Sequence, residues 1–269
     1  MTSEAIVNKV FLVTGGAAGV GAGVCRALLA ENARSVIIVD IAQREGATLE
    51  SELNNKFGAL RAKFIKCDIA DDKQLSEAYG QVLDKYRRID GVINNAAVLS
   101  DDDCDNDRMI GVNFTATVNS TLKAIKLMRA DGGGHGGAVV NISSLLAIDK
   151  SPRLPVYSAT KAAVLQFSNC IGMEPHYSNT KVRILSACLG PTDTAILHRH
   201  NLGRFDKGCA ACLISRAEKR QSVESAALGV LEAIKRGASG STWIIANDKP
   251  AVDVTRDLSD VFAGVSKKF

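Results

Sequence analysis

The sequence predicts one α/β domain, a doubly wound parallel sheet with helices on both faces. Short β-branched runs alternate with longer segments of helical spacing along the chain, the order that produces a parallel sheet with right-handed crossovers. The strand-like runs are mostly continuous apolar stretches, as expected of strands covered on both faces. No linker-like composition and no repeat interrupts the 269 residues, so residues 1–269 are expected to form a single domain.

The elements follow one another in regular order. Helix 42–58 is expected to end at Gly58, and helix 71–88 repeats apolar residues at helical spacing from Leu75 to Tyr86. The expected strands are 9–15, 35–40, 60–68, 89–97, 138–144, 181–190 and 241–246. The expected helices are 20–33, 42–58, 71–88, 106–129, 157–174 and 222–236.

Composition narrows the class of protein. Hydrophobic residues make up 46% and charged residues 23%, which fits a soluble globular protein with a substantial core. The net charge of +4 is small and dispersed, so neither nucleic acid nor a membrane surface is expected as a partner. The N-terminus resembles no export signal, and the odd number of cysteines, seven, favours free thiols in a reducing compartment. A cytoplasmic location is therefore expected.

The stretch TGGAAGVG, residues 14–21, connects the first expected strand to the first helix. Thr14, Gly15, Gly19, Val20 and Gly21 fit the pattern TGxxxGxG. Glycines allow a tight turn and let the backbone approach a pyrophosphate, while the free N–H groups of the following helix point at the phosphates. Glycine clusters also occur in purely structural turns, and this spacing is not GxGxxG. The position between strand and helix favours a dinucleotide site.

Asp40 ends the second expected strand. A carboxylate at this place accepts hydrogen bonds from the adenosine ribose and repels a 2′-phosphate, and the glycine turn contains no Arg or Lys to offset that repulsion. We therefore expect NAD rather than NADP as the cofactor. Two alternatives stay open: Asp40 acts only as a turn former, or nearby Arg44 weakens the preference.

Two further strand ends carry candidate cofactor contacts. Asp68 follows the third strand, near the expected adenine position, and the small residues of NNAA (94–97) leave room for a flat cofactor at the end of the fourth. Each alone is equally compatible with ordinary turn chemistry. Together they fall where ligands of such sheets bind, outside the carboxyl ends of the strands. The expected contacts at the strand ends are Ile41, Cys67, Asp68, Ile69, Asn95, Ala96 and Ala97.

Tyr157 and Lys161 are four residues apart and share a helix face. A Tyr hydroxyl titrates near about 10, and a nearby ammonium or the positive nicotinamide lowers that pKa. The phenol then accepts a proton from an alcohol while hydride leaves for the nicotinamide. Ser144, at the end of the fifth strand, is placed to bind the reacting oxygen. Ser143 points to the opposite side, because side chains alternate along a strand.

With these motifs the chain resembles the short-chain dehydrogenase/reductase family, in the branch of insect alcohol dehydrogenases and 15-hydroxyprostaglandin dehydrogenase. Besides TGxxxGxG, Asp40, Asp68 and NNAA, the resemblance depends on VNFTA (112–116), NISS (141–144), PVYSATKAAV (155–164) and LGPTDTAI (189–196). It implies a Rossmann-type sheet of seven parallel strands, oxidoreductase activity and a homodimer or homotetramer.

The resemblance also implies roles for individual residues. Asn113 holds a water that connects Lys161 to solvent, and Ser144 polarises the substrate oxygen. Tyr157 is the acid/base, while Lys161 lowers its pKa and binds the nicotinamide ribose.

By the same resemblance, Asn95 is expected to line the ribose side of the cofactor, and Thr192 and Thr194, next to Pro191, are expected to contact the carboxamide end. Three residues depart from the expected pattern: Ala97 replaces the usual Gly, Leu189 replaces a common Pro, and Leu154 is apolar where 15-hydroxyprostaglandin dehydrogenase has an amide.

Segment 195–220 is expected to form a lid over the substrate. Expected substrate contacts are Ser144, Leu146, Leu154, Tyr157, Ile196 and Leu197, and their apolar character favours a lipophilic alcohol or ketone. His198, His200, Cys209 and Cys212 match no standard structural zinc spacing, so no metal is expected.

The leading interpretation is an NAD-dependent oxidoreductase that acts on a lipophilic secondary alcohol or its ketone. An NADPH-preferring carbonyl reductase is a second enzymatic alternative, which the charge at position 40 discriminates. A non-catalytic dinucleotide-binding sensor is the alternative from another class, and its expected sign is a broken set of Asn113, Ser144, Tyr157 and Lys161.

Overall fold

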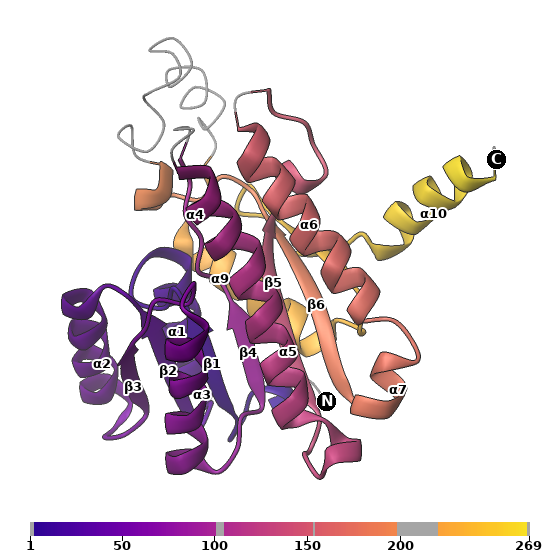
Figure 1. Cartoon of the computed structure of the whole chain (residues 1–269). Coiled ribbons are helices and arrows are strands. Elements are labelled where there is room, and N and C mark those ends of the chain that lie inside the picture. Colours follow the sequence, from indigo (N-terminus) through magenta and orange to yellow (C-terminus); the bar gives the residue numbers. More distant parts are fainter. Residues whose placement is uncertain (1–2, 101–104, 153, 198–219, 268–269) are drawn as a thin grey trace.

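The computed structural model describes residues 3–100, 105–152, 154–197 and 220–267, and these ranges contain one eight-stranded sheet. The strand order is β3-β2-β1-β4-β5-β6-β7-β8 (Figure 1). Strands β1 to β7 pair in parallel, as predicted. The strands are β1 (Val10–Thr14), β2 (Ser35–Asp40), β3 (Ala62–Lys66), β4 (Gly91–Asn94), β5 (Gly137–Ser144), β6 (Val182–Leu189), β7 (Thr242–Ile245) and β8 (Val252–Asp253).

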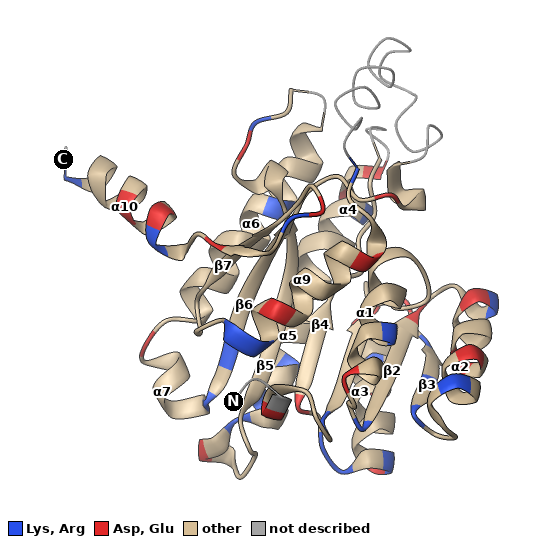
Figure 2. Cartoon of the chain, turned by 180° about the vertical axis from the view of Figure 1, so that it is seen from behind, with Lys and Arg blue, Asp and Glu red and all other residues tan. Residues whose placement is uncertain are grey.

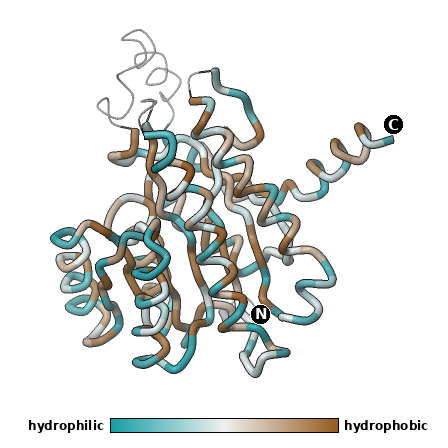
Figure 3. Tube along the Cα trace, in the orientation of Figure 1, coloured by the Kyte–Doolittle hydropathy of each residue, from teal (hydrophilic) through white to brown (hydrophobic). Residues whose placement is uncertain are grey.

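Helices cover both faces of the sheet, and an apolar core lies between the helices and the sheet on each face. One core joins the sheet to α1 (Gly19–Ala30), α2 (Gln43–Phe57) and α9 (Val223–Arg236). The opposite face is covered by α3 (Asp72–Tyr86), α5 (Ala116–Met128) and α6 (Pro155–Ile171) (Figure 1). Figure 3 shows hydrophobic residues along the strands and hydrophilic ones mainly in helices and connections. The predicted doubly wound α/β domain is confirmed.

The cores follow from the sequence pattern. In α9, Ala227, Val230, Leu231 and Ile234 recur on one face and are buried. β1 and β2 are buried along nearly their whole length, which agrees with their continuous apolar sequences. Charged residues lie mainly on helix surfaces and at strand ends (Figure 2). Among the helices of the described ranges, none has the length and apolarity that crossing a membrane requires.

The sheet contains one strand more than the seven that the family resemblance implied. β8 pairs antiparallel with β7 at the edge of the sheet. It is only two residues long and both are exposed, so the sequence contains no apolar run that would predict it. After it, α10 (Thr255–Ser266) extends away from the sheet and has no buried residue (Figure 1).

The long helix expected over 106–129 consists of three parts. Short helix α4 (Asn106–Ile110) leads into a π-helical turn over Gly111–Thr115, which continues as α5. A π turn contains one residue more than an α turn, and such turns are frequent at functional sites. Here the π turn contains Asn113.

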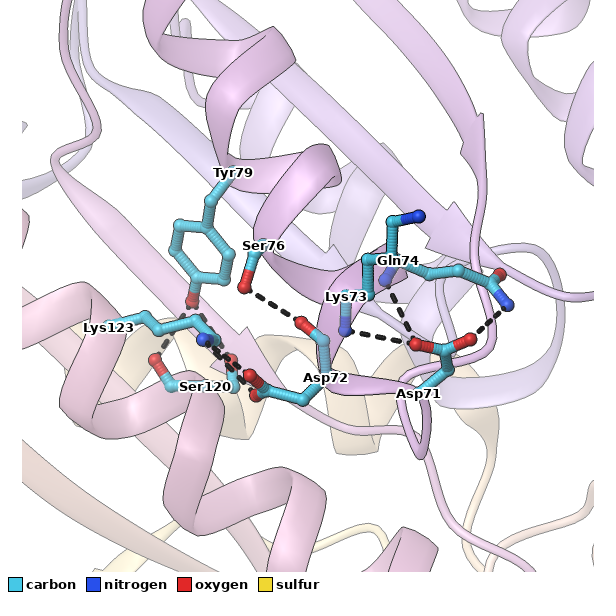
Figure 4. A network of polar contacts seen from close by, with 8 residues as sticks. All are labelled: Asp71, Asp72, Lys73, Gln74, Ser76, Tyr79, Ser120 and Lys123. Carbon is cyan, nitrogen blue, oxygen red and sulfur yellow. Dashed lines mark hydrogen bonds and ion pairs between the residues drawn. The ribbon is translucent and has the colours of Figure 1, made fainter.

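Polar contacts join α3 to α5 on the surface and in the core (Figure 4). Asp71 caps α3 by accepting from the backbone N–H groups of Lys73 and Gln74 at 2.9 and 3.2 Å. Asp72 forms an ion pair with Lys123 at 3.1 Å, at the exposed side of the contact. In the core, the Tyr79 hydroxyl lies 2.9 Å from the Ser120 hydroxyl and 3.0 Å from the Ser120 carbonyl oxygen.

Two buried tyrosines of α3 provide a matched pair for a stability test. Tyr79→Phe removes the hydrogen bonds to Ser120 and is expected to lower the free energy of unfolding by about 1–2 kcal/mol. The buried hydroxyl of Tyr86 has no hydrogen-bond partner among the described residues, so Tyr86→Phe is expected to change stability by less than about 0.5 kcal/mol or to increase it. Urea denaturation of both variants measures the difference, and equal losses would contradict it.

Candidate active site

A cavity of about 780 Å³ opens at the carboxyl ends of the parallel strands. Its wall contains the turn between β1 and α1 and the residues that follow β2, β3, β4, β5 and β6. The chain reverses its direction of winding between β1 and β4, and ligands of such sheets bind in the crevice at this point. The cavity therefore lies where the strand order predicts a binding site.

The predicted cofactor residues gather around this cavity. Those that line it are Gly15, Gly19, Val20, Asp40, Ile41, Cys67, Asp68, Ile69, Asn95, Ala96, Ala97, Tyr157, Lys161, Pro191, Thr192 and Thr194. Thr14 and Gly21 do not line the cavity, and both contact other residues of the turn or of the end of β4. The Thr14 hydroxyl accepts from the backbone N–H groups of Asn95 and Ala96 at 3.1 and 3.2 Å.

Glycine is required at two positions of the first turn. Gly15 has a φ of +61°, and a Cβ there would lie 2.7 Å from the Ala96 Cα atom. A Cβ on Gly21 would collide with the Gly15 carbonyl oxygen. The turn is thus closely packed against the end of β4, and the Asn95 side chain fixes it by donating to the Thr14 and Gly15 carbonyls at 3.0 Å each.

Asp40 has a structural role as well as a place in the cavity wall. Its Oδ2 atom accepts from the Ala17 N–H of the glycine turn at 3.0 Å, and its Oδ1 atom accepts from the Ala42 N–H at 3.0 Å. Asp40 therefore does stabilise the turns around it, as one of the two alternatives supposed. Each carboxylate oxygen accepts more than one hydrogen bond, so the side chain can also bind a ligand hydroxyl.

Asp68 and Arg108 lie together at another part of the wall. Asp68 accepts from the Ala70 N–H at 3.0 Å, and one of its oxygens lies 3.8 Å from an Arg108 nitrogen. Arg108 also lines the cavity, a contact that the sequence analysis missed. It belongs to α4, 40 residues from Asp68, and only the fold brings the two together.

Tyr157 faces Ser144 at the cavity wall. Burial raises the pKa of Tyr157 to about 12, and its hydrogen bond with Ser144 acts in the opposite direction. Ser144 also accepts from the Leu146 N–H at 3.1 Å, which fixes its side chain at the end of β5. Burial therefore dominates the pKa of Tyr157, and a lowering of that pKa by Lys161 stays a prediction.

Lys161 is buried, with 2% of its surface exposed, and its amine donates to the Ile142 carbonyl oxygen at 2.9 Å. The amine lies 5.7 Å from the centre of the Tyr157 ring. Burial lowers the pKa of Lys161 to about 8, while the nearby Cys188 raises it slightly. The amine is therefore close to its titration point at neutral pH.

Ser143 and Ser144, the last two residues of β5, both line the cavity but bond different partners. The buried Ser143 hydroxyl donates to the Lys161 carbonyl oxygen at 2.8 Å. Cys188 is the partner of Ser143 in the neighbouring strand β6, and its side chain bonds Ser143. Ser143 thus fixes the Lys161 turn of α6 on the sheet, whereas Ser144 bonds the Tyr157 hydroxyl.

Asn113 does not line the cavity. Its side chain accepts from the Val98 N–H at 2.8 Å and donates to the Val98 carbonyl at 2.9 Å and to the Thr160 hydroxyl at 3.3 Å. The backbone carbonyl oxygen of Asn113 accepts from the Thr117 hydroxyl at 3.0 Å. Asn113 therefore joins the segment after β4 to α6, and the water relay remains a proposal.

The expected apolar substrate residues form one cluster in the wall of the cavity. Leu154, Leu146, Ile196 and Leu197 pack with the Tyr157 ring, and Leu99, which the sequence analysis missed, joins them. Leu99 follows β4 and has no motif that marks it. The rest of the expected lid, and His198, His200, Cys209 and Cys212, lie outside the described residues.

The strand order and the glycine turn at its reversal point place the chain in the class of dinucleotide-binding α/β proteins. Comparison with known proteins gives the family. The model of the short chain dehydrogenase family matches residues 9–204. The chain belongs to the short-chain dehydrogenase/reductase family, whose members are oxidoreductases that bind a nicotinamide dinucleotide and small-molecule substrates.

Individual relatives agree with this assignment. The chain is 32% identical over 202 residues to the 15-hydroxyprostaglandin dehydrogenase [NAD(+)] of Macaca fascicularis, covering 74% of this chain and 75% of the relative. It is 32% identical over 197 residues to alcohol dehydrogenase 2 of Ceratitis cosyra, covering 73% and 74%. Among solved structures, levodione reductase matches with a TM-score of 0.77 at 19% identity, covering 90% of this chain and 97% of the reductase.

Lys161→Met is expected to stabilise the fold near neutral pH. The folded-state pKa of about 8 lies below the ordinary value of 10.5, so a charged Lys161 destabilises the folded chain. Wild-type stability should rise as pH increases from about 8 to 10.5, where the unfolded chain binds more protons. The variant should be more stable by about 1–3 kcal/mol at pH 7.

Denaturant unfolding across this pH range measures the effect, and the gap between variant and wild type should shrink as pH rises. Lys126→Met, at an exposed position of α5, is the matched control. A Lys161→Met protein less stable than wild type at pH 7 would contradict this account of the buried amine.

Proposed function

We propose that the protein is an NAD-dependent oxidoreductase that transfers a hydride between the nicotinamide and a lipophilic secondary alcohol or its ketone. The observation that carries the proposal is the position of Tyr157, Ser144 and Lys161 on the wall that also contains the glycine turn and Asp40. A proton-transfer group and a dinucleotide cradle therefore share one cavity.

The residues present fit a nicotinamide dinucleotide. Gly15 and Gly19 leave the backbone of the first turn open to a pyrophosphate, and α1 begins there with free N–H groups. Asp40, Thr192 and Thr194 line the same cavity; we expect Asp40 to bind the adenosine ribose and the two threonines to contact the carboxamide end. When bound, the oxidised cofactor supplies the hydride acceptor and a positive charge.

The protein side of the reaction is a proton transfer at the Tyr157 hydroxyl. Ser144 bonds this hydroxyl, and we expect it to hold the substrate oxygen beside Tyr157. Because burial holds the pKa of Tyr157 at about 12, the phenol is protonated before cofactor binds. A positive charge brought close to the ring favours the phenolate, so base function is expected only in the cofactor complex. Lys161 provides a second proton-exchanging group whose pKa of about 8 suits neutral pH.

The apolar cluster of Leu99, Leu146, Leu154, Ile196 and Leu197 supports a lipophilic substrate. Two relatives of the chain agree with a substrate that bears a hydroxyl group, since they are a 15-hydroxyprostaglandin dehydrogenase [NAD(+)] and an alcohol dehydrogenase.

Location and assembly form a subsidiary part of the proposal. Cys25, Cys67, Cys170 and Cys188 are free thiols, which favours a reducing compartment such as the cytoplasm. A homodimer or homotetramer is proposed from the family resemblance.

Tyr157→Phe tests the proposed acid/base. Turnover of a panel of secondary alcohols, followed by NADH absorbance, should fall by about 10²–10⁴-fold, because the variant has no group to accept the alcohol proton. NADH binding should persist, and Tyr177→Phe, on α7 (His176–Thr180) outside the cavity wall, should retain turnover. Full activity of Tyr157→Phe would refute the assigned base.

Asp40→Asn tests the cofactor preference. It removes the negative charge and retains one acceptor oxygen for the glycine turn, so the ratio of kcat/KM with NADP to that with NAD should rise by about tenfold or more, or about 1.4 kcal/mol. Asp71→Asn, at the cap of α3, is the matched control and should leave the ratio unchanged. A wild-type protein that already prefers NADPH would overturn this account of Asp40 and favour the carbonyl reductase alternative.

A further inference from the structure

Gln221 is a buried polar residue that none of the sequence motifs includes. Its exposed fraction is 0%, and it lies directly before the cap of α9. Its backbone forms a parallel bridge with Thr192, the loop residue expected at the carboxamide end of the cofactor. The Gln221 N–H donates to the Pro191 carbonyl at 2.9 Å, and the Asp193 N–H donates to the Gln221 carbonyl at 3.0 Å.

The side chain of Gln221 adds two further contacts. Its amide nitrogen donates to the Thr192 hydroxyl at 3.0 Å and to the Ile245 carbonyl at the end of β7 at 2.9 Å. The Thr192 hydroxyl in turn donates to the Gly190 carbonyl at 3.0 Å. Because a carbonyl only accepts, the Ile245 contact fixes which end of the amide faces Thr192. The amide oxygen, buried on the other side, has no partner among the described residues.

These contacts, together with an ion pair between Asp193 and Arg220 at 3.1 Å, hold the loop that follows β6. Residues 190–194 follow β6 with little regular structure, yet Pro191, Thr192 and Thr194 line the cavity. At the far side, Thr194 packs against the glycine turn, since a Cβ on Gly19 would lie 3.1 Å from its methyl group. The loop is therefore fixed between the first turn and the end of β7 before any ligand binds.

We propose that Gln221 is a positioning residue for the nicotinamide end of the cofactor. It does not touch the cavity and acts through Thr192, whose backbone and hydroxyl it holds against the end of β7. A loop held in its binding conformation does not lose further freedom when the ligand arrives, and this increases affinity. The inference rests on the proposed function, because it requires a dinucleotide whose nicotinamide lies beside Thr192.

The alternative is that Gln221 only stabilises the sheet edge. The two roles differ in which part of the cofactor they affect. ADP-ribose contains the adenosine and pyrophosphate but no nicotinamide, so it measures the glycine turn and Asp40 alone. A positioning role changes the affinity for NADH and leaves that for ADP-ribose intact, whereas a structural role changes both or neither.

Gln221→Met is the decisive variant. Methionine fills a similar volume and loses only the donated bonds, because the amide oxygen has no partner among the described residues. Titration calorimetry should show NADH binding weakened by about tenfold, because the released loop must then be ordered on binding, and ADP-ribose binding within about twofold of wild type. Gln166→Met, at an exposed position of α6, is the matched control and should bind both ligands normally.

Thr192→Val provides an independent test if Gln221→Met does not fold. It removes the hydroxyl through which Gln221 acts, so it should show the same selective loss of NADH affinity. Where Gln221→Met does fold, the double variant should lose little more than either single variant. Unchanged NADH affinity in either variant, or equal losses for NADH and ADP-ribose, would overturn the inference. A wild-type protein that binds neither ligand would instead refute the proposed function.

Discussion

The hydrogen bond between the Lys161 amine and the Ile142 carbonyl is the contact on which the site depends. It joins α6 to the last residues of β5. The residues one turn earlier on the helix therefore face the end of the strand. Tyr157 meets Ser144 for this reason. The Ser143 hydroxyl adds a second connection between β5 and α6 by donating to the Lys161 carbonyl oxygen. Helix and strand are thereby held in one register.

A buried polar network between β4, β5, α5 and α6 also stabilises this register. Asn94 of β4 donates to Asn141 of β5 at 2.8 Å, and Asn141 donates to Ser168 of α6 at 2.8 Å. Ser120 and Thr121 of α5 complete it through bonds to the two asparagines. Satisfied networks of this kind specify one arrangement of their elements, since every partial rearrangement leaves a buried polar group without a partner.

The sequence predicted most of the fold, because strands buried on both faces are continuously apolar. It also predicted the residues that gather at the carboxyl ends of the strands, since parallel strands end at one edge of the sheet. The misses have physical reasons. Exposed β8 lacks an apolar pattern, and Leu99 and Gln221 acquire their places through contacts distant in sequence. The pKa of Tyr157 depends on the depth of burial, which residue spacing does not reveal.

The π turn over Gly111–Thr115 limits how the length of the chain can vary. Removing one residue there would restore a regular α-helix and rotate α4 by about 100° relative to α5. Arg108 would then leave Asp68, and Met109 would leave the core. The glycine-rich connection before β5 has no such restriction at its exposed residues. Insertions and deletions among homologous chains should therefore accumulate in that connection and be rare between α4 and α5.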